Sequence, residues 1–307
     1  RKYAFRLDAA APAVQLVCSG RFVRVLLAVD HRFAFMLLTA LTASAAASCS
    51  HLVYMPSKNV VDAPREMPED LWFHTSDGVR LHGWWLEARG ARRGTMVQFH
   101  GNAGNITSHF AQLEWVTQHG YDLFTFDYRG YGRSEGVPSQ AGLNRDARAA
   151  LALARTKSAK GMRPDLVLYG QSLGGAVLLR ALADEPDRSR IRSVIVEGTF
   201  NSYREAAASV MYQTAAGLAL AGLAFTVIDD DYAPAPHVAS LSPTPLLVIH
   251  DRDDPVIPFD FGRAIFRAAR QPKDLWPLRT GGHLTARDEP GFEGALLDWL
   301  DDPRPLR

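Results

Sequence analysis

The stretch Leu166–Arg180, LVLYGQSLGGAVLLR, constrains the fold of this 307-residue chain more than any other. Val167–Tyr169 is a short β-branched and aromatic run, typical of a buried strand, and helix formers follow from Leu173 onward. Between them, Gly170-Gln171-Ser172-Leu173-Gly174 matches the pattern G-x-S-x-G. A serine at the apex of such a tight turn is held in a strained conformation with its hydroxyl exposed. The pattern predicts Ser172 as a nucleophile and the amide of Leu173 as an oxyanion donor.

Strands alternate with helices through most of the chain. We expect strands at residues 95–99, 121–126, 167–169, 193–196, 246–250 and 275–278, and helices at 109–118, 141–154 (capped by Ser139), 173 onward, 259–269 and 291–300. Ahead of them, residues 71–75 and 79–86 flank a three-residue turn, which predicts an antiparallel hairpin. This order predicts an α/β fold with a mostly parallel sheet and helices on both faces. No linker divides residues 51–307, so we expect one catalytic domain there.

Two further side chains are expected beside Ser172. A serine hydroxyl becomes a good nucleophile only when a base takes its proton, and the base needs a third group to orient it. In an open parallel sheet, such groups lie just beyond the carboxyl ends of strands. His283 lies in a glycine-flanked loop after the last expected strand. Asp254 lies after the strand 246–250, where Pro255–Pro258 turns the chain sharply. The order serine, acid, histidine is the one expected for such a sheet.

Other carboxylates compete with Asp254 for the role of the acid. Asp251 and Asp253 lie in the same turn, and Glu197, at the end of its own strand, is the second choice. This acidic turn is weak as a cation site, because it lacks further spaced oxygen ligands and contains Arg252. No metal is therefore predicted. Surface or structural roles are expected for His74, His82, His100, His109, His119 and His250.

The segment His100–Asn105, HGNAGN, is expected to complete the oxyanion hole. The hole needs a second backbone donor beside Leu173, and a glycine-containing loop after the strand 95–99 supplies one. The amide of Asn102 is the expected donor, with Ala103 as the alternative. A dinucleotide or phosphate loop is disfavoured, because the segment lacks the G-x-G-x-x-G spacing and no ribose-binding acid is placed for it. No cofactor is predicted.

Residues 200–236 are expected to form a small helical lid. The segment 205–228 is largely apolar and alanine-rich, and its uninterrupted apolar part is too short to span a bilayer. A core helix is the alternative reading of this segment. The aromatic side chains expected to line an apolar acyl pocket are Tyr131, Phe200, Tyr203 and Tyr212.

The N-terminal segment, residues 1–50, carries a different signal. Residues 33–48, FAFMLLTALTASAAAS, form an uncharged apolar run of the size of a signal-peptide core. Ala46-Ala47-Ser48-Cys49 resembles a bacterial lipoprotein cleavage site, although Ala46 stands where such sites usually carry Leu. The segment predicts secretion or membrane tethering through Cys49, and hence a cell-envelope location. A buried or disordered extension of a cytoplasmic protein is the alternative.

Composition argues against a nucleic-acid partner and against cysteine-based sites in the catalytic domain. A formal net charge of +1 gives no electrostatic case for a nucleic-acid partner. The two cysteines, Cys18 and Cys49, both precede the expected catalytic domain. That domain can therefore form neither a disulfide framework nor a thiolate metal site.

Taken together, several segments resemble the α/β-hydrolase superfamily, particularly its small-lid, bud-emergence-mutant-like branch, which is grouped with serine-aminopeptidase-like and lipase-like hydrolases. They span about residues 51–300 and are HGNAGN at 100–105, DYRGYGRSEG at 127–136, GQSLGG at 170–175, EGTF at 197–200, HDRDDPVIP at 250–258 and GGH at 281–283. The resemblance implies the α/β-hydrolase fold. It also implies these roles: nucleophile Ser172, acid Asp254, base His283, and oxyanion donors Asn102 and Leu173. One departure is Asp251, where the family usually has glycine.

The expected function is hydrolysis of a small-molecule carboxylic ester or thioester through an acyl-enzyme on Ser172. Two alternatives stay open. One is a peptidase of the aminopeptidase type, and the other is a catalytically idle α/β-hydrolase fold that serves as a binding module. Reactive residues at all three positions favour an enzyme over the binding module.

Overall fold

The computed structural model describes residues 15–18, 21–24, 53–62, 64, 67–158, 165–212 and 228–303. The chain divides into two compact units, Arg1–Cys49 and Ser50–Arg307. In the first unit, β1 (Gln15–Cys18) pairs antiparallel with β2 (Arg21–Arg24). The sequence pattern does not predict this hairpin, because strands of 4 residues are too short to show alternation. The apolar run 33–48 and Cys49 lie outside the described residues, and no described helix is long and apolar enough to cross a membrane.

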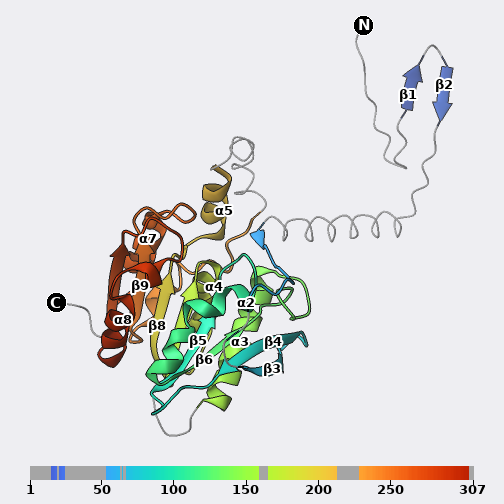
Figure 1. The fold of residues 1–307 in the computed structure, drawn as a ribbon. Coiled ribbons are helices and arrows are strands. Elements are labelled where there is room, and N and C mark those ends of the chain that lie inside the picture. The colour runs from blue at the N-terminus through green and yellow to red at the C-terminus, as the bar shows by residue number, and fades with distance from the viewer. Residues whose placement is uncertain are drawn as a thin grey trace. The chain divides into compact units, whose positions relative to one another are not determined.

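Among the described residues, the second unit contains an 8-stranded sheet with the order β10-β9-β8-β7-β5-β6-β4-β3 (Figure 1). Its strands are β3 (Glu69–His74), β4 (Arg80–Leu86), β5 (Gly94–Phe99), β6 (Tyr121–Phe126), β7 (Leu166–Gln171), β8 (Ile191–Glu197), β9 (Leu246–Asp251) and β10 (Lys273–Leu278). β4 pairs antiparallel with both β3 and β6, whereas the other neighbours are parallel. The predicted hairpin and mostly parallel sheet are confirmed.

Continuous apolar runs explain the central strands. Every residue of β5, β6, β7 and β9 is buried, whereas β3 at the edge of the sheet is largely exposed. Strands covered on both faces need such uniform burial rather than an alternation of apolar and polar residues. Because β5 to β10 run parallel, their carboxyl ends meet at one edge of the sheet, where the expected site residues follow.

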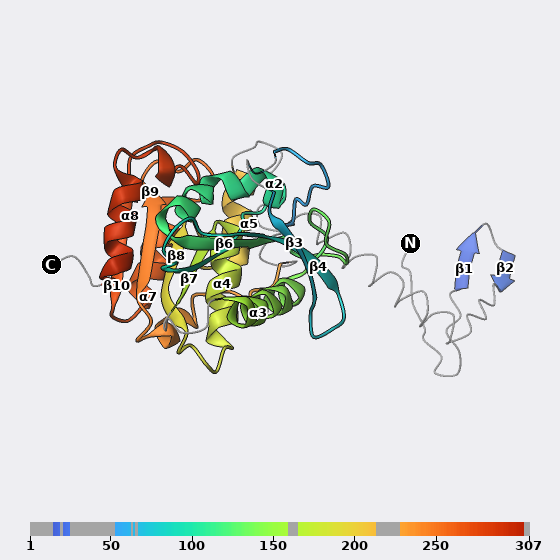
Figure 2. The ribbon, with the colours of Figure 1, turned by 60° about the horizontal axis from the view of Figure 1, so that its bottom comes forward.

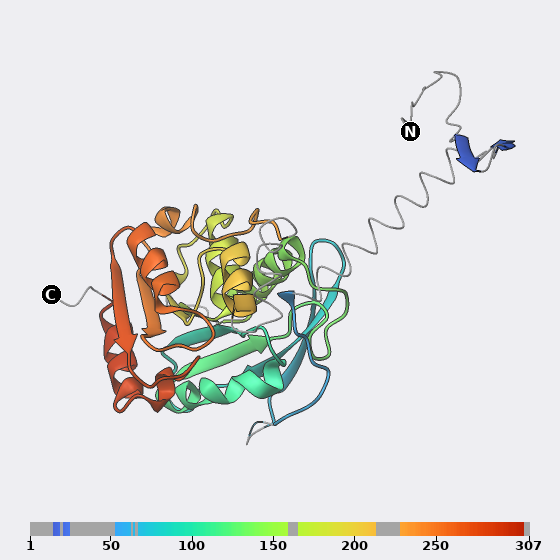
Figure 3. The ribbon, with the colours of Figure 1, turned by 90° about the horizontal axis from the view of Figure 1, so that it is seen from above.

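Helices cover both faces of this sheet (Figures 2 and 3). On one face, the core includes residues of α3 (Gln140–Lys157), α4 (Leu173–Ala183) and α7 (Phe259–Ala268). On the other face, it includes residues of α8 (Phe292–Asp301) and of the turns between residues 110 and 119. The remaining described helices outside residues 106–119 are α5 (Tyr203–Tyr212), η3 (Val238–Leu241) and η4 (Ala286–Asp288). The predicted cap of α3 is present, since the Ser139 hydroxyl accepts a hydrogen bond from the Gly142 N–H at 3.1 Å.

The prediction of one helix over residues 109–118 is wrong. The chain forms a short α-helix, α2 (Ile106–His109), followed by the 3₁₀ helices η1 (Phe110–Gln112) and η2 (Glu114–His119). The Gln98 side chain donates to the His109 carbonyl at 2.9 Å, which is the acceptor that a continuing α-helix would use. The Leu113 N–H bonds instead to the Phe110 carbonyl at 2.9 Å, so the turn tightens.

The expected lid, residues 200–236, is described only in part. α5 begins at Tyr203, and residues 213–227 lie outside the described chain. Asp230 joins the two described ends of the segment. Its Oδ1 accepts from the Tyr203 N–H and its Oδ2 accepts from the Ser202 hydroxyl, both at 2.7 Å. These bonds fix the start of α5, as an N-terminal carboxylate does.

Candidate active site

Ser172 lies at the junction of β7 and α4. Its backbone has φ 51° and ψ −116°, a conformation that is strained for a residue with a side chain. Close packing explains the two flanking glycines. A Cβ on Gly170 would lie 2.6 Å from the Gly175 Cα, and one on Gly174 would lie 2.0 Å from the Phe99 carbonyl oxygen. The strained turn and the glycine spacing therefore agree with the sequence pattern.

Main-chain bonds hold Ser172 against the end of β8. Its N–H donates to the Glu197 carbonyl at 2.8 Å, and its carbonyl accepts from the Thr199 hydroxyl at 2.8 Å. Both bonds use only backbone atoms of Ser172. They fix the place of the serine without using its hydroxyl.

Asp254 and His283 form a hydrogen-bonded pair. Asp254 Oδ2 lies 2.7 Å from His283 Nδ1. An ionised carboxylate can only accept, so Nδ1–H donates and Nε2 is the ring nitrogen able to take a proton. Asp254 Oδ1 accepts from the N–H groups of Val256 at 2.8 Å and Ile257 at 2.9 Å, which fixes the carboxylate within its own turn.

Ser172 and His283 converge on the dipeptide Glu197-Gly198. Ser172 is bonded to the Glu197 carbonyl, as described above, and a Cβ on Gly198 would lie 3.1 Å from His283 Cε1. The imidazole therefore packs against the Gly198 backbone, which has φ 57° and suits glycine. The end of β8 thus brings together the loops that carry the expected nucleophile and base.

Glu197, the second candidate for the acid, has a different set of partners. Its Oε2 accepts from the Tyr169 hydroxyl at 2.9 Å and from Gln171 Nε2 at 3.2 Å, and its Oε1 accepts from the Ala286 N–H at 3.0 Å. Burial raises the pKa of the Glu197 carboxyl. Asp254 is therefore the carboxylate bonded to His283, whereas Glu197 braces the chain just beyond that histidine.

His100 and His250 are buried and bonded to backbone carbonyls. His100 Nδ1 donates to the Gly101 carbonyl at 2.7 Å, and burial lowers the pKa of His100 to about 4. His250 Nε2 donates to the Ile257 carbonyl at 2.8 Å, and burial lowers its pKa as well. Both rings are therefore neutral near pH 7 and serve as loop braces.

The two expected oxyanion donors lie on either side of the nucleophile turn. Leu173 is the first residue of α4, so its N–H belongs to the amides at a helix N-terminus that have no intrahelical partner. Asn102 lies in the loop after β5. A Cβ on the preceding Gly101 would lie 3.8 Å from the Gln171 carbonyl oxygen, next to Ser172. This loop therefore approaches the nucleophile turn closely.

The side chain of Asn102 is tied to other segments. Its Nδ2 donates to the Val53 carbonyl at 2.6 Å, and its Oδ1 accepts from the Met55 N–H at 3.0 Å and from the Tyr131 hydroxyl at 2.7 Å. The amide side chain therefore orients the loop, and the backbone N–H of Asn102 stays the expected oxyanion donor.

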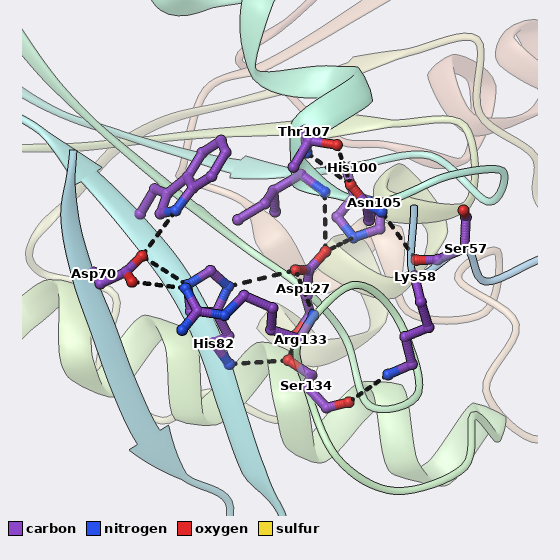
Figure 4. A network of polar contacts seen from close by, with 12 residues as sticks. Ser57, Lys58, Asp70, His82, His100, Asn105, Thr107, Asp127, Arg133 and Ser134 are labelled. Atoms are coloured by element: carbon purple, nitrogen blue, oxygen red, sulfur yellow. Dashed lines mark hydrogen bonds and ion pairs between the residues drawn. The ribbon is translucent and has the colours of Figure 1, made fainter. Parts of the chain in front are cut away.

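A polar network around Asp127 supports the same loop (Figure 4). Asp127 Oδ1 accepts from the Ile106 N–H at 2.9 Å and lies 3.8 Å from His100 Nε2. Its Oδ2 lies 3.6 Å from Nδ1 of the buried His82, whose Nε2 lies 2.9 Å from Asp70 Oδ1. Residues 127–136, singled out above only through the family resemblance, thus join the hairpin to the loop of Asn102.

The expected pocket aromatics are placed unequally. Tyr131, Phe200 and Tyr203 are buried in one core cluster, with Phe200 and Tyr203 in edge contact at 5.1 Å between ring centroids. Tyr131 reaches the oxyanion loop through its bond to Asn102. The side chain of Tyr212 lies outside the described part of the chain. Their role as an acyl pocket stays a prediction.

A cavity of about 730 Å³ lies elsewhere, with Trp85, Phe110, Trp115 and Arg287 among its lining residues, and it contains no predicted site residue.

Within the described residues, no cluster of three His, Cys, Asp or Glu side chains is arranged to hold a metal ion.

Asp251 is the site residue whose place the sequence did not reveal. It is not bonded to His283 as an acid would be. Its carboxylate instead accepts hydrogen bonds from Thr280 and Gly281, two residues of the loop that carries His283. A carboxylate at a position where the resemblance leads one to expect glycine is the signal that could have drawn attention to it.

Three comparisons with known proteins show what this chain is similar to. Residues 90–231 match the family described as serine aminopeptidase, S33. The uncharacterized protein YfhR of Escherichia coli O157:H7 is 36% identical over 238 residues, which cover 76% of this chain and 79% of that protein. The lysophosphatidylserine lipase ABHD12 of Danio rerio is 34% identical over 246 residues, which cover 72% of this chain and 62% of that protein. The structure of the Pyrococcus furiosus esterase Pf2001 has a TM-score of 0.63 at 16% identity and covers 82% of this chain and 97% of that one.

Proposed function

This chain is a hydrolase of the α/β-hydrolase superfamily, and on that premise we propose that it cleaves small-molecule carboxylic esters or thioesters through an acyl-enzyme on Ser172. The observation that carries the proposal is the hydrogen bond of 2.7 Å between Asp254 and His283. The His283 ring lies against Gly198, the residue after the Glu197 carbonyl that accepts from the N–H of the strained Ser172. The proposal assigns Ser172, His283 and Asp254 the three roles of nucleophile, base and acid that acyl transfer needs.

The proposed reaction assigns one task to each group. His283 Nε2 takes the Ser172 proton as Oγ attacks the acyl carbonyl, and Asp254 stabilises the imidazolium that forms. The amides of Leu173 and Asn102 donate to the oxyanion of the tetrahedral intermediate. His283 then protonates the leaving alcohol or thiol. A water activated by His283 releases the acid and restores the Ser172 hydroxyl. This sequence uses no metal or cofactor.

A peptidase of the aminopeptidase type is the second candidate, favoured by the description of the matching family. The same three residues would serve it, with an amine as the leaving group. The names of two similar proteins, a lipase and an esterase, favour the ester over the amide. A non-catalytic binding module is disfavoured, because the histidine and the carboxylate are already paired.

A substrate panel tests the proposal. Purified protein is assayed with p-nitrophenyl esters, acyl thioesters and aminoacyl arylamides, with Ser172→Ala as the matched control. We expect turnover of an ester or thioester and a loss of at least about 10³-fold in kcat for Ser172→Ala. Turnover of the arylamides alone would assign the chain to the peptidases. No turnover of any member, by wild type as by Ser172→Ala, would favour the binding module.

We also propose, from the sequence of residues 33–49 alone, that the protein is tethered at the cell envelope through a lipid on Cys49. Metabolic labelling with an alkyne fatty acid in the expression host tests this. Cys49→Ser is expected to lose the label and the membrane association, whereas Cys18→Ser, the matched control, keeps both. Unmodified protein that retains residues 1–48 and stays out of the membrane fraction would contradict the proposal.

A further inference from the structure

Asp251, the last residue of β9, is a buried carboxylate that accepts four hydrogen bonds. Its Oδ2 accepts from the Thr280 N–H at 2.6 Å, the Thr280 hydroxyl at 2.6 Å and the Gly281 N–H at 3.0 Å. Its Oδ1 accepts from the Asp253 N–H at 2.7 Å. Burial alone would raise the pKa of this carboxyl, but the hydrogen bonds outweigh it and hold the pKa below its usual range. The side chain is therefore ionised at neutral pH.

These bonds join the two turns that carry the proposed acid and base. Asp253 immediately precedes Asp254, and Gly281 lies two residues before His283. β10 ends at Leu278, whose register partner on β9 is Asp251 itself. The sheet therefore ends before it reaches Thr280 or Gly281, and the Asp251 side chain continues the connection between the strands beyond that point.

The loop that carries His283 also needs outside support. Leu284, the next residue, has φ 59°, a strained conformation that persists only where the surroundings hold it. The loop is held at its far end by Glu197, through the Ala286 N–H, and at its near end by Asp251, through Thr280 and Gly281. His283 lies between these two carboxylate anchors.

We infer that Asp251 is a positioning residue for the Asp254–His283 pair, an inference that rests on the proposed function. One of its oxygens fixes the turn of the acid and the other fixes the loop of the base, so the carboxylate sets how the two turns face each other. Without it, the Asp254–His283 hydrogen bond and the approach of His283 to Ser172 lose their fixed geometry. Displacement of a catalytic group by about 1 Å can lower the rate by about 10²-fold.

The test compares Asp251→Asn with Asp253→Asn, a matched control. The asparagine side chain has nearly the shape of the aspartate that it replaces, but it turns an NH₂ group toward N–H donors. The Asp253 side chain is exposed, and only its backbone N–H bonds to Asp251. Asp253→Asn therefore removes one negative charge from the same turn but keeps the hydrogen bonds of Asp251. With the best substrate of the panel, we expect kcat of Asp251→Asn to fall about ten- to hundredfold with KM within about twofold, and Asp253→Asn to match wild type.

A second variant and a spectroscopic signal separate positioning from general loss of structure. Thr280→Val removes the hydroxyl that donates to Asp251 and that also contacts the Thr285 hydroxyl. Because both variants remove the bond between Thr280 and Asp251, we expect a smaller fall in kcat that is less than additive with that of Asp251→Asn. The downfield proton resonance of His283 Nδ1–H, bonded to Asp254, is expected to broaden or vanish in Asp251→Asn and to persist in Asp253→Asn.

An Asp251→Asn variant that keeps both kcat and the His283 resonance would overturn the inference, even if its melting temperature falls. So would additive effects of Asp251→Asn and Thr280→Val on kcat. The resonance needs no substrate. If wild type hydrolyses nothing in the panel, the proposed function fails, while the resonance alone still decides whether Asp251 positions His283.

Discussion

At the scale of single residues, Ser172, the proposed nucleophile, has a backbone conformation that suits glycine. Its φ of 51° persists because the main chain is bonded on both sides, to Glu197 and to Thr199. Strain of this kind, held by the surrounding structure, is typical of sites where a group must be presented for chemistry. The stability of the protein is therefore expected to rise when the side chain at this position is removed.

We predict that Ser172→Gly is more stable than Ser172→Ala by about 1 kcal/mol, although both are inactive. Glycine relieves the strain at positive φ, and this gain exceeds its greater loss of backbone entropy on folding. Urea unfolding of the two variants measures the difference. Equal stabilities, or a more stable alanine variant, would show that the turn is not strained.

Asp254 and Glu197 are predicted to differ sharply in their effect on rate. Asp254→Asn leaves His283 without the acceptor that fixes its tautomer, so we expect kcat to fall about 10³- to 10⁴-fold. Glu197→Gln keeps an acceptor for the Ala286 N–H, and we expect kcat to stay within about tenfold of wild type. Steady-state kinetics on both variants checks this. The reverse ranking would make Glu197 the acid.

The sequence predicts where Ser172, Asp254 and His283 lie along the chain, because each follows an apolar strand and parallel strands share one edge. It leaves Glu197 and Asp251 open as acids, because a carboxylate at a strand end looks the same whether it contacts a histidine or a backbone amide. Hydrogen bonds to Thr280, Gly281 and Ala286 depend on how separate loops meet, and no local pattern records them.

At the scale of elements, the strands of the 8-stranded sheet are predicted to within about two residues, whereas β1 and β2 are not predicted. The long helices are predicted nearly as well as that sheet, since their periodicity extends over several turns. The helix over residues 109–118 is the exception. There the side chain of Gln98, from the preceding strand, donates to the His109 carbonyl, which would be the acceptor for the Leu113 N–H in a continuous α-helix. Such interference from another element overrides local preference and cannot be seen in the segment itself.

The close contact between β5 and α4 at Gly174 leads to a prediction about stability. Gly174→Ala would place a Cβ against the Phe99 carbonyl, so we expect a loss of about 3 kcal/mol or more in the free energy of unfolding. Gly294 in α8 is the matched control, because nothing lies within 4 Å of an added Cβ there. Gly294→Ala is expected to stabilise the protein by about 0.5–1 kcal/mol. A tolerated Gly174→Ala would mean that the Ser172 turn packs against β5 more loosely than described.

At the scale of the whole molecule, ion pairs connect the hairpin to the body of the hydrolase domain. Asp77, in the turn between β3 and β4, accepts from both terminal nitrogens of Arg129 at 2.9 and 3.0 Å, and Arg129 also binds the buried Asp146. Hydrogen bonds from Arg129 and Thr75 hold the pKa of Asp77 well below its usual range. The folded state therefore favours the ionised form of Asp77.

This leads to a pH-dependent prediction. A carboxyl with a lowered pKa stabilises the fold above its unfolded pKa of about 3.9, and that contribution is lost as the pH falls through the lower, folded value. Wild type should therefore be more stable than Asp77→Asn at pH 7, and the difference should shrink as the pH falls below about 4. Urea unfolding across this range measures it. Asp260→Asn, at an exposed pair within α7, is the control and should change little at any pH. A difference that grows toward low pH would contradict the assignment.

The segment 53–61 is a second connection at this scale, because it lies along the loop of Asn102. Asn105 Nδ2 donates to the Ser57 carbonyl at 2.9 Å, while its Oδ1 caps α2 (Figure 4). The same Nδ2 also donates to the Asn59 carbonyl at 2.8 Å. We predict that Asn105→Asp, which keeps the cap and loses both donated bonds, lowers kcat, and that Asn105→Ala lowers kcat further and costs about 1–2 kcal/mol of stability. Kinetics and urea unfolding check both variants. An unchanged kcat in both would show that the bonds of Asn105 to residues 53–61 do not affect the active site.

The most direct test of the account is covalent labelling with a fluorophosphonate, followed by mass spectrometry of the intact chain and its peptides. We predict a single adduct on Ser172, absent from Ser172→Ala and formed far more slowly by His283→Ala. An adduct on any other residue, or equal labelling of wild type and Ser172→Ala, would contradict the claim that Ser172, His283 and Asp254 act together.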